Sequence, residues 1–383
     1  MDDNVIYSST VWTSRLNSVW MVMIGCAFMA AVIPNLSFVG RHGKFIKSIN
    51  SATKDGSSGA YIENHAMNAC NSSSEHSNDE LLFSYLERLT VPKSHFMHFY
   101  IVGISWGLVT ICCRLYFLRT SFGLVAMLMF ELHAVRRLYE CYYFTIYGDS
   151  RIHISGYLAG LAHYVLAPLT LLVASIERES VFRWSAHQYV AGAAVNLVDL
   201  FFKAFAIVLF VYANYAQFKC HYILYECKYS ALQGRGSGGD CDEIISAIGS
   251  SGGSIGASDE ISRKPVPVSV SSPYDKVPAQ KHHQLLISPE GSDSNGDRSA
   301  RYALPRGGMF AYVACPHYFF EICSYVAMWM QISTSLTCLL MAAWVFVNLS
   351  VVAYNQYFWY LDTFPEAFRK EKKHWRILFP GVW

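Results

Sequence analysis

The sequence is poor in charged residues. Asp, Glu, Lys and Arg make up only 15% of its 383 residues, whereas soluble domains carry about 25%. Hydrophobic residues account for 53% of the chain and aromatic residues for 15%. This composition excludes an ordinary soluble enzyme and predicts an integral membrane protein.

Several site signatures are missing as well. No Cys-x-x-Cys pair occurs among the 11 scattered cysteines, so neither a metal site nor a disulfide framework is expected. The net charge of +2 and the lack of a basic arm argue against a nucleic-acid partner. The Gly-rich run at residues 249–256 lacks the Lys-Ser/Thr of a phosphate loop, so it encodes no soluble nucleotide domain. Nothing in the sequence indicates an obligate protein partner.

Long apolar runs predict about seven transmembrane helices. The chain begins without a basic region and a small-residue cleavage site, so its first apolar run is expected to be a retained anchor. The predicted spans are residues 18–39, 96–117, 122–147, 154–176, 190–215, 318–331 and 333–357.

The last residues of the chain are basic, which predicts a cytosolic C-terminus. Counting back through seven spans makes residues 1–17 a lumenal tail and places the loop 40–94 in the cytosol. Residues 229–300 are rich in Gly, Ser, Asp and Pro, and we expect a disordered cytosolic insertion there. The membrane region is then 18–228, and residues 301–383 form the C-terminal part with the last two spans and the basic tail.

The third predicted span contains an unusual group of charged residues. On a helix His133 and Arg137 share a face, as do Arg136 and Glu140, because residues four apart are neighbours. Charge in lipid is costly, so we interpret the group as ligand-binding, with self-neutralising ion pairs as the alternative. In the fifth span, Asp199 and Lys203 are also four apart, and there we expect a structural ion pair inside the bundle.

A polar stretch, residues 304–321, precedes the sixth predicted span. Gly307 allows the backbone to approach a ligand closely, and Arg306 and His317 are suitable partners for phosphate. Glu321 stands where a membrane helix begins, and a carboxylate there is costly without a function. The alternative is an interfacial loop with a snorkelling arginine and a capping glutamate.

These blocks together resemble the steroid 5-alpha-reductase family, and within it the polyprenol reductase branch. Residues 304–312 are similar to the family's I-P-x-G-x-x-F-E-Y-V signature, and residues 316–321 to its P-H/N-Y-x-x-E continuation. Further blocks lie at residues 41–44, 98–100, 136–140, 163–166, 217–224 and 359–365. Their shared order along the chain carries the resemblance.

The chain departs from the family pattern at two places. Ala311 stands where the family has Glu, and Asn355 and Gln356 replace the His that precedes the final Tyr. Tyr357 is a candidate to take over a proton or hydrogen-bond role from the lost His. A weakened enzyme is the other explanation for these changes.

The resemblance implies an all-α integral membrane protein of the endoplasmic reticulum, with the cofactor pocket inside the helix bundle. It implies NADPH as reductant and a long-chain polyprenoid lipid as substrate, whose alpha-isoprene double bond is reduced on the route to dolichol for protein N-glycosylation. The residues that would bind the cofactor are Arg137, Gln217, Lys219, His221, Arg306, Gly307, His317, Tyr318, Glu321, Tyr360 and Arg376.

The chemistry of the reduction favours an aldehyde. Hydride addition to an isolated alkene is unfavourable, whereas a conjugated carbonyl gives an enolate that a positioned acid can stabilise. We therefore expect polyprenal, rather than polyprenol, to be the species reduced. His98 or Tyr100 is the predicted acid, and the alternative for both is an ordinary residue at the membrane interface.

Three other functions stay open at this point. The protein could reduce a steroid or an enoyl thioester, or it could be a membrane methyltransferase that uses S-adenosylmethionine. A catalytically weakened, lipid-binding relative is the third alternative. Binding of NADPH or of S-adenosylmethionine discriminates the reductase from the methyltransferase.

Overall fold

The computed structural model describes residues 3–32, 89–117, 122–148, 150–188, 197–233, 303–332, 335–371 and 374–381. The predicted cytosolic loop 40–94 and the predicted insertion 229–300 lie outside these ranges, apart from residues 89–94 and 229–233.

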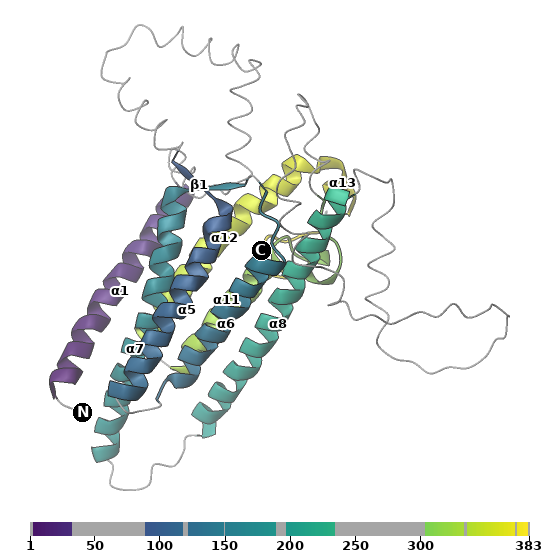
Figure 1. The fold of residues 1–383 in the computed structure, drawn as a ribbon. Coiled ribbons are helices and arrows are strands. Elements are labelled where there is room, and N and C mark those ends of the chain that lie inside the picture. The colour runs from purple at the N-terminus through teal and green to yellow at the C-terminus, as the bar shows by residue number, and fades with distance from the viewer. Residues whose placement is uncertain are drawn as a thin grey trace, which may run out of the picture.

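Long helices pack side by side in one bundle (Figure 1). They are α1 (Asp3–Val32), α5 (Phe96–Cys112), α6 (Leu124–Tyr143), α7 (Ile154–Gln188), α8 (Leu197–Gln233), α11 (Pro316–Gln331) and α12 (Leu336–Thr363). In the described ranges, five helices are long and apolar enough to cross a membrane. The predicted all-α membrane protein is thereby confirmed, while the count of seven spans stays a prediction because α6 and α11 are not among those five.

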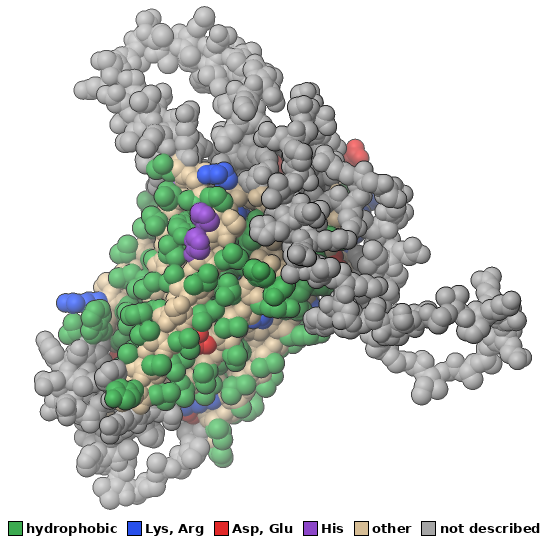
Figure 2. All heavy atoms as spheres, viewed as in Figure 1, with side chains coloured by type: hydrophobic (Ala, Val, Ile, Leu, Met, Phe, Trp, Pro, Cys, Tyr) green, Lys and Arg blue, Asp and Glu red, His purple; other side chains and the backbone are tan. Residues whose placement is uncertain are grey.

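Hydrophobic side chains cover the outer face of the bundle. Figure 2 shows this face as largely apolar between its two ends. On α8 the exposed side chains include Leu197, Phe201 and Val208. A face of this kind is expected where helices contact lipid rather than water.

Several helices extend beyond the apolar runs that predicted them. α7 continues to Gln188 and α8 to Gln233, beyond the ends of the predicted spans at 176 and 215. α7 continues because its charged residues have partners on other helices: Thr13 donates to Glu177 at 3.4 Å, and Arg114 pairs with Glu179. α1 likewise begins at Asp3, well before the predicted start of the first span.

A short two-stranded antiparallel sheet joins two distant connections at one end of the bundle. β1 (Thr90–Pro92) pairs antiparallel with β2 (Arg151–His153), with Thr90 opposite His153. Directly after β1, the short 3-10 helix η2 (Lys93–His95) begins, and the Lys93 backbone N–H donates to the Ser150 carbonyl at 2.9 Å. The start of α5 is thus fixed beside the α6–α7 connection.

The C-terminal segment packs at the same end. After α13 (Pro365–Glu371), Trp375 Nε1 donates to the Phe310 carbonyl at 2.6 Å. The Ala314 N–H donates to the Arg376 carbonyl at 2.8 Å. β1 and α13 both lie away from the N-terminus (Figure 1). The segments predicted to share the cytosolic side therefore lie together, while the side of the membrane that they face stays a prediction.

Candidate active site

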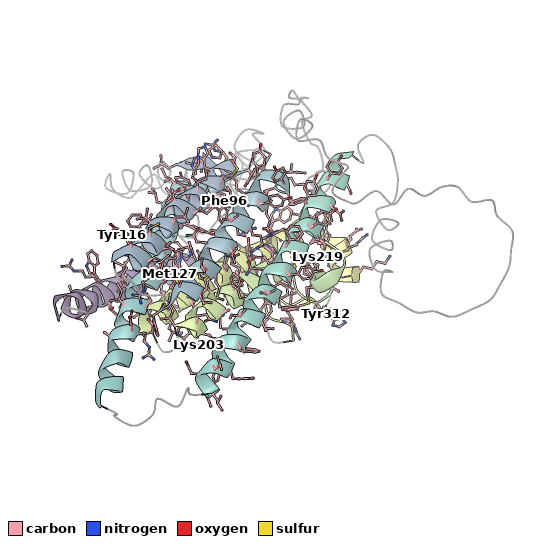
Figure 3. The ribbon with its side chains drawn as sticks, turned by 60° about the horizontal axis from the view of Figure 1, so that its bottom comes forward. Phe96, Tyr116, Met127, Lys203, Lys219 and Tyr312 are labelled. Atoms are coloured by element: carbon pink, nitrogen blue, oxygen red, sulfur yellow. The ribbon has the colours of Figure 1, made fainter. Side chains whose placement is uncertain are left out.

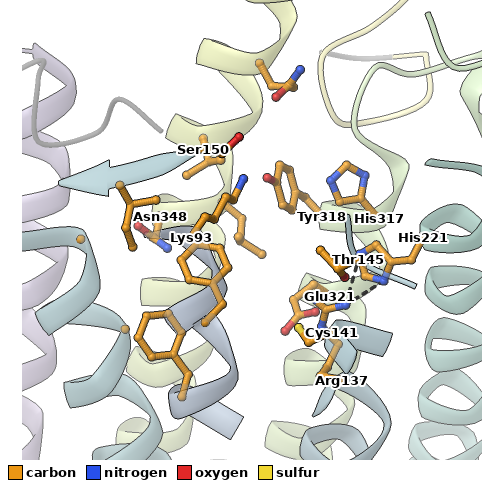
Figure 4. Close-up of a pocket in the computed structure, with 18 of the residues that line it drawn as sticks. Lys93, Arg137, Cys141, Thr145, Ser150, His221, His317, Tyr318, Glu321 and Asn348 are labelled. Atoms are coloured by element: carbon orange, nitrogen blue, oxygen red, sulfur yellow. Dashed lines mark hydrogen bonds between the residues drawn. The ribbon is translucent and has the colours of Figure 1, made fainter. Parts of the chain in front are cut away.

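A cavity of about 590 Å³ lies inside the bundle, at the end where β1 and β2 pair. Its walls come from α1, α5, α6, α7, α8, α11 and α12, together with the α6–α7 connection. Figure 4 shows Arg137, His221, His317 and Glu321 on one side of it, across from Lys93 and Asn348. The volume falls within the range of roughly 300–1,000 Å³ typical of small-molecule and cofactor sites.

One wall of the cavity is polar and is built by α6, α8 and α11. Arg137, His221, His317 and Glu321 line it. The rings of His221 and His317 lie 5.5 Å apart. The guanidinium of Arg137 also lies over the ring of Tyr100, 5.4 Å from its centroid. This polar wall brings together residues that the sequence predicted as cofactor-binding.

Glu140 stands behind the polar wall and connects its groups. Its side chain is 1% exposed and does not line the cavity. It accepts hydrogen bonds from Arg136 and Arg137, and His221 Nδ1 lies 2.7 Å from its Oε2. The predicted shared face of Arg136 and Glu140 is confirmed, and these residues form the ion pair that stood as the alternative interpretation. Glu140 holds both Arg137 and His221 in place where they face the cavity.

Glu321 is held by residues of α6 and α8. His133 Nε2 lies 2.9 Å from Glu321 Oε1, and Gln217 donates to Glu321 Oε2. His133 Nδ1 in turn lies 3.1 Å from Asn214 Oδ1. In the described part of the chain, His133 thus pairs with Glu321 rather than with Arg137, the residue four positions away on the same helix. These contacts compensate the cost of burying a carboxylate.

The opposite wall is mostly apolar. Phe96 and Phe99 of α5, Ala30 of α1 and Val345 of α12 line it. Cys26 of α1 also lines the cavity, and it is exposed. α1 thus contributes an accessible residue to the apolar wall.

Four aromatic and imidazole side chains gather on α5, α7 and α11: Tyr100, His163, Tyr164 and Tyr325. His163 Nε2 lies 2.8 Å from the hydroxyl of Tyr325. The rings of Tyr100 and Tyr164 meet edge to face at 5.1 Å. All four side chains line the cavity, so it holds several hydroxyl and imidazole groups that can carry a proton.

Several lining atoms are buried without a hydrogen-bond partner in the described part of the chain. They are Arg137 Nε, Tyr147 Oη, His163 Nδ1, His317 Nδ1 and Gln356 Nε2. A buried polar group of this kind costs free energy unless a ligand or a water molecule satisfies it. Together with the cationic Arg137, they fit a polar, phosphate-bearing cofactor such as the NADPH that the sequence predicts.

The structure places about half of the predicted site residues at the cavity. Those that line it are Tyr100, Arg137, Gln217, His221, His317, Tyr318, Glu321 and Tyr360. Those that do not are His98, Lys219, Arg306, Gly307, Tyr357 and Arg376.

Two of the misplaced residues lie on the wrong face of a helix. His98 is exposed and contacts the hydroxyl of Tyr157 at 3.0 Å. Lys219 is exposed on α8 (Figure 3), with its amine 5.6 Å from the ring of Tyr215. Both are two residues from a lining residue, and two residues correspond to about 200° around a helix. The predictions of a catalytic His98 and a cofactor-binding Lys219 are therefore not supported by their positions.

Three of the remaining predicted residues, Gly307, Tyr357 and Arg376, have structural roles outside the cavity. Gly307, with φ of 83°, forms the turn before the 3-10 helix η5 (Gly308–Ala311). Tyr357 packs against Phe368, with ring centroids 5.3 Å apart. The backbone N–H of Arg376 donates to the Tyr312 carbonyl at 3.1 Å. These residues shape the loop and the tail next to the cavity, and Gly307 does not line it.

Sequence reasoning missed other lining residues, among them Lys93, Asn348 and Gln356. Asn348 was detectable in principle, because it is a polar residue within the last apolar run. Lys93 gave no such signal, because a lysine next to a predicted span is usually an interfacial residue. Its place in the cavity depends on the pairing of β1 with β2.

Comparisons with known proteins agree with the resemblance seen in the sequence. The 3-oxo-5-alpha-steroid 4-dehydrogenase family matches residues 280–383. A polyprenal reductase of Ailuropoda melanoleuca is 30% identical over 160 residues, covering 35% of this chain and 48% of that protein. A polyprenal reductase of Caenorhabditis elegans is 23% identical over 325 residues, covering 78% of this chain and 82% of that protein.

The chain matches about half the length of the mammalian relatives, 48% for the Homo sapiens polyprenal reductase at 29% identity. The family match includes His317, Tyr318 and Glu321, which line the cavity. With that match over its C-terminal part, and with relatives named polyprenal reductase, the chain is similar to the steroid 5-alpha-reductase family and to the polyprenal reductases.

Proposed function

We propose that this protein reduces the alpha-isoprene double bond of polyprenal with NADPH, a step toward dolichol in the endoplasmic reticulum membrane. One observation carries the proposal: a single cavity joins the polar wall to a mostly apolar wall that includes the exposed Cys26 of α1. A phosphate-bearing cofactor and a long isoprenoid need these two environments side by side.

The polar wall is the proposed binding surface for the cofactor. Arg137 supplies a guanidinium suited to phosphate, and His221 and His317 supply ring nitrogens within the same wall. When bound, NADPH supplies the hydride. Glu321 and Gln217, which are tied to each other, present polar groups that can orient the cofactor's amide or hydroxyl groups.

The apolar wall is the proposed substrate side. An isoprenoid chain is as apolar as lipid, so most of it can remain in the bilayer. Phe96, Phe99 and Val345 provide surface for the first isoprene units, and the exposed Cys26 marks the proposed way in from the membrane. Only the aldehyde end must reach the polar wall.

Tyr100 is the proposed acid. Of the three side chains that the sequence suggested, Tyr100 lines the cavity, whereas His98 and Tyr357 do not. Its hydroxyl can donate a hydrogen bond to the aldehyde oxygen and stabilise the enolate that develops as the double bond is reduced. The nearby Arg137 adds positive charge at 5.4 Å from the Tyr100 ring.

The test uses purified protein in detergent with NADPH and either polyprenal or polyprenol. We expect oxidation of NADPH with polyprenal and reduction of its alpha double bond, detected by mass spectrometry. Turnover of polyprenol at the same rate, without prior oxidation, would contradict the aldehyde hypothesis. A wild-type protein that leaves polyprenal unchanged would contradict the proposed function.

A Tyr100→Phe variant tests the acid. We expect kcat to fall about a hundredfold, the low end of general acid catalysis, with little change in the KM for NADPH. Tyr116→Phe is the matched control, because Tyr116 follows the same helix and is 74% exposed at its other end (Figure 3). Full activity of Tyr100→Phe would rule out this role for Tyr100.

A further inference from the structure

The charges of the polar wall and of the residues behind it largely cancel. Arg136 and Arg137 are balanced by Glu140, which contacts both, and by Glu321, which contacts Gln217 and His133. Pairing avoids the large cost of leaving any one of these buried charges uncompensated. It provides little net positive charge for a ligand with several phosphate charges, so another cation is needed at the cavity.

Lys93 supplies such a charge from the opposite side. It lines the cavity, and Figure 4 shows it facing Tyr318 and His317 across the open space. Its amine lies 5.6 Å from the ring centroid of Phe96. No ion pair joins it to a carboxylate of the described residues.

The backbone of Lys93 is fixed in place. Its N–H donates to the Ser150 carbonyl at 2.9 Å, and the preceding residue, Pro92, lies opposite Arg151 in the β1–β2 pair. The amine is therefore presented to the cavity from a well-supported position, near the Asn348 and Ser150 side chains shown in Figure 4. A lysine ammonium supplies three donors, and Lys93 forms no ion pair with the described residues. Lysine is a common phosphate ligand in proteins.

We infer that Lys93 binds a phosphate group of the dinucleotide cofactor, across the cavity from Arg137. This inference rests on the proposed NADPH-dependent activity. The phosphate can be the 2′-phosphate of the adenosine ribose, which NADH lacks, or the pyrophosphate, which NADH shares. In the first case Lys93 also selects NADPH over NADH.

The experiment is direct binding by isothermal titration calorimetry with detergent-solubilised, full-length protein. NADPH, NADH and 2′,5′-ADP are titrated into wild type, Lys93→Met and Lys93→Arg. For Lys93→Met we expect NADPH to bind about tenfold or more weakly, as for loss of one charged hydrogen bond. Lys93→Arg, which keeps the positive charge, is expected to bind NADPH close to wild-type affinity.

The other ligands identify the phosphate. If Lys93→Met weakens NADPH and 2′,5′-ADP but leaves NADH unchanged, the contact is to the 2′-phosphate. If NADPH and NADH weaken by the same factor, the contact is to the pyrophosphate. Either pattern supports the inference.

Lys219→Met is the matched control, because Lys219 is exposed on the outside of α8. We expect it to bind NADPH like wild type. Unchanged NADPH affinity in Lys93→Met would overturn the inference, as would an equal loss in Lys219→Met. Lys93→Gln repeats the test if the Met variant does not fold, which thermal unfolding reports.

Binding and turnover separate the two proposals. A wild-type protein that binds NADPH but leaves polyprenal unreduced keeps the role of Lys93 and contradicts the proposed function. A wild-type protein that does not bind NADPH contradicts both. Turnover of polyprenal together with unchanged binding in Lys93→Met contradicts the Lys93 inference only.

Discussion

Two buried groups of charged residues lie at different places in the bundle, and they differ in what surrounds them. Arg114 follows α5 and pairs with Glu179 of α7, and its Nε donates to the Phe122 carbonyl at 3.1 Å. Neither side chain lines the cavity. The group around Glu140 also contains paired charges, but its Arg137 and His221 face the cavity.

The contrast shows how one type of interaction can serve stability or function. Arg114 is 0% exposed and Glu179 4%, so both are enclosed by protein. Glu140 is equally enclosed, yet its partners Arg137 and His221 line the cavity, whereas Arg114 and Glu179 do not. We conclude that the first group holds helices together, while the second presents donors to a ligand.

The largest expected effect comes from breaking the enclosed pair. Arg114→Ala leaves Glu179 as an uncompensated buried charge, which costs about 3–5 kcal/mol. We expect a large fall in the thermal unfolding temperature of the detergent-solubilised protein. Removing both charges with Arg114→Met and Glu179→Leu should recover most of the stability. A double variant as unstable as Arg114→Ala would show that the loss comes from the missing ion pair itself, not from an uncompensated charge on Glu179.

Glu140→Gln tests the group that faces the cavity. Glu140 orients Arg137 and His221, so we expect the KM for NADPH to rise about tenfold to a hundredfold, as for loss of charged hydrogen bonds. The kcat at saturating NADPH should change less, because Glu140 does not touch the substrate cavity. A variant with lower kcat and unchanged KM would contradict this positioning role.

A second substitution separates positioning from simple charge balance. Arg136 shares the carboxylate of Glu140 but does not line the cavity. Combining Glu140→Gln with Arg136→Gln therefore removes the buried charge imbalance without restoring the hold on Arg137. We expect stability to recover and the KM for NADPH to stay high. Recovery of both would indicate a purely structural role for Glu140.

Local spacing in the sequence predicted part of this arrangement. The Arg136–Glu140 pair follows from a separation of four residues, and α11 ends at Gln331 as the apolar run predicted. The same helical geometry, applied fully, would have excluded His98 and Lys219, which are two residues from Tyr100 and His221. Both residues were predicted because they lie in sequence blocks that resemble the family, as if every residue of such a block faced the cavity.

Other features depend on contacts between distant segments. His133 and Glu321 meet although 188 positions separate them in the chain. Lys93 enters the cavity wall because β1 pairs with β2, some 60 residues further on. Neither contact leaves a periodic signal in the sequence, since helix packing and strand pairing between remote segments determine them. The role proposed for Lys93 could therefore come only from the structure.

The smallest effect is expected at a third ion pair, Asp199–Lys203 on α8 (Figure 3). The sequence predicted this pair, and the structure confirms it at 2.7 Å, but it lies at the surface rather than inside the bundle. The side chains are 41% and 33% exposed, so solvent or headgroups screen the interaction. Lys203→Met should change the free energy of unfolding by about 1 kcal/mol or less and leave the KM for NADPH unchanged. If Lys203→Met lost as much free energy of unfolding as Arg114→Ala, exposure would not determine how much these ion pairs stabilise the protein. That result would contradict the distinction between enclosed and exposed charges.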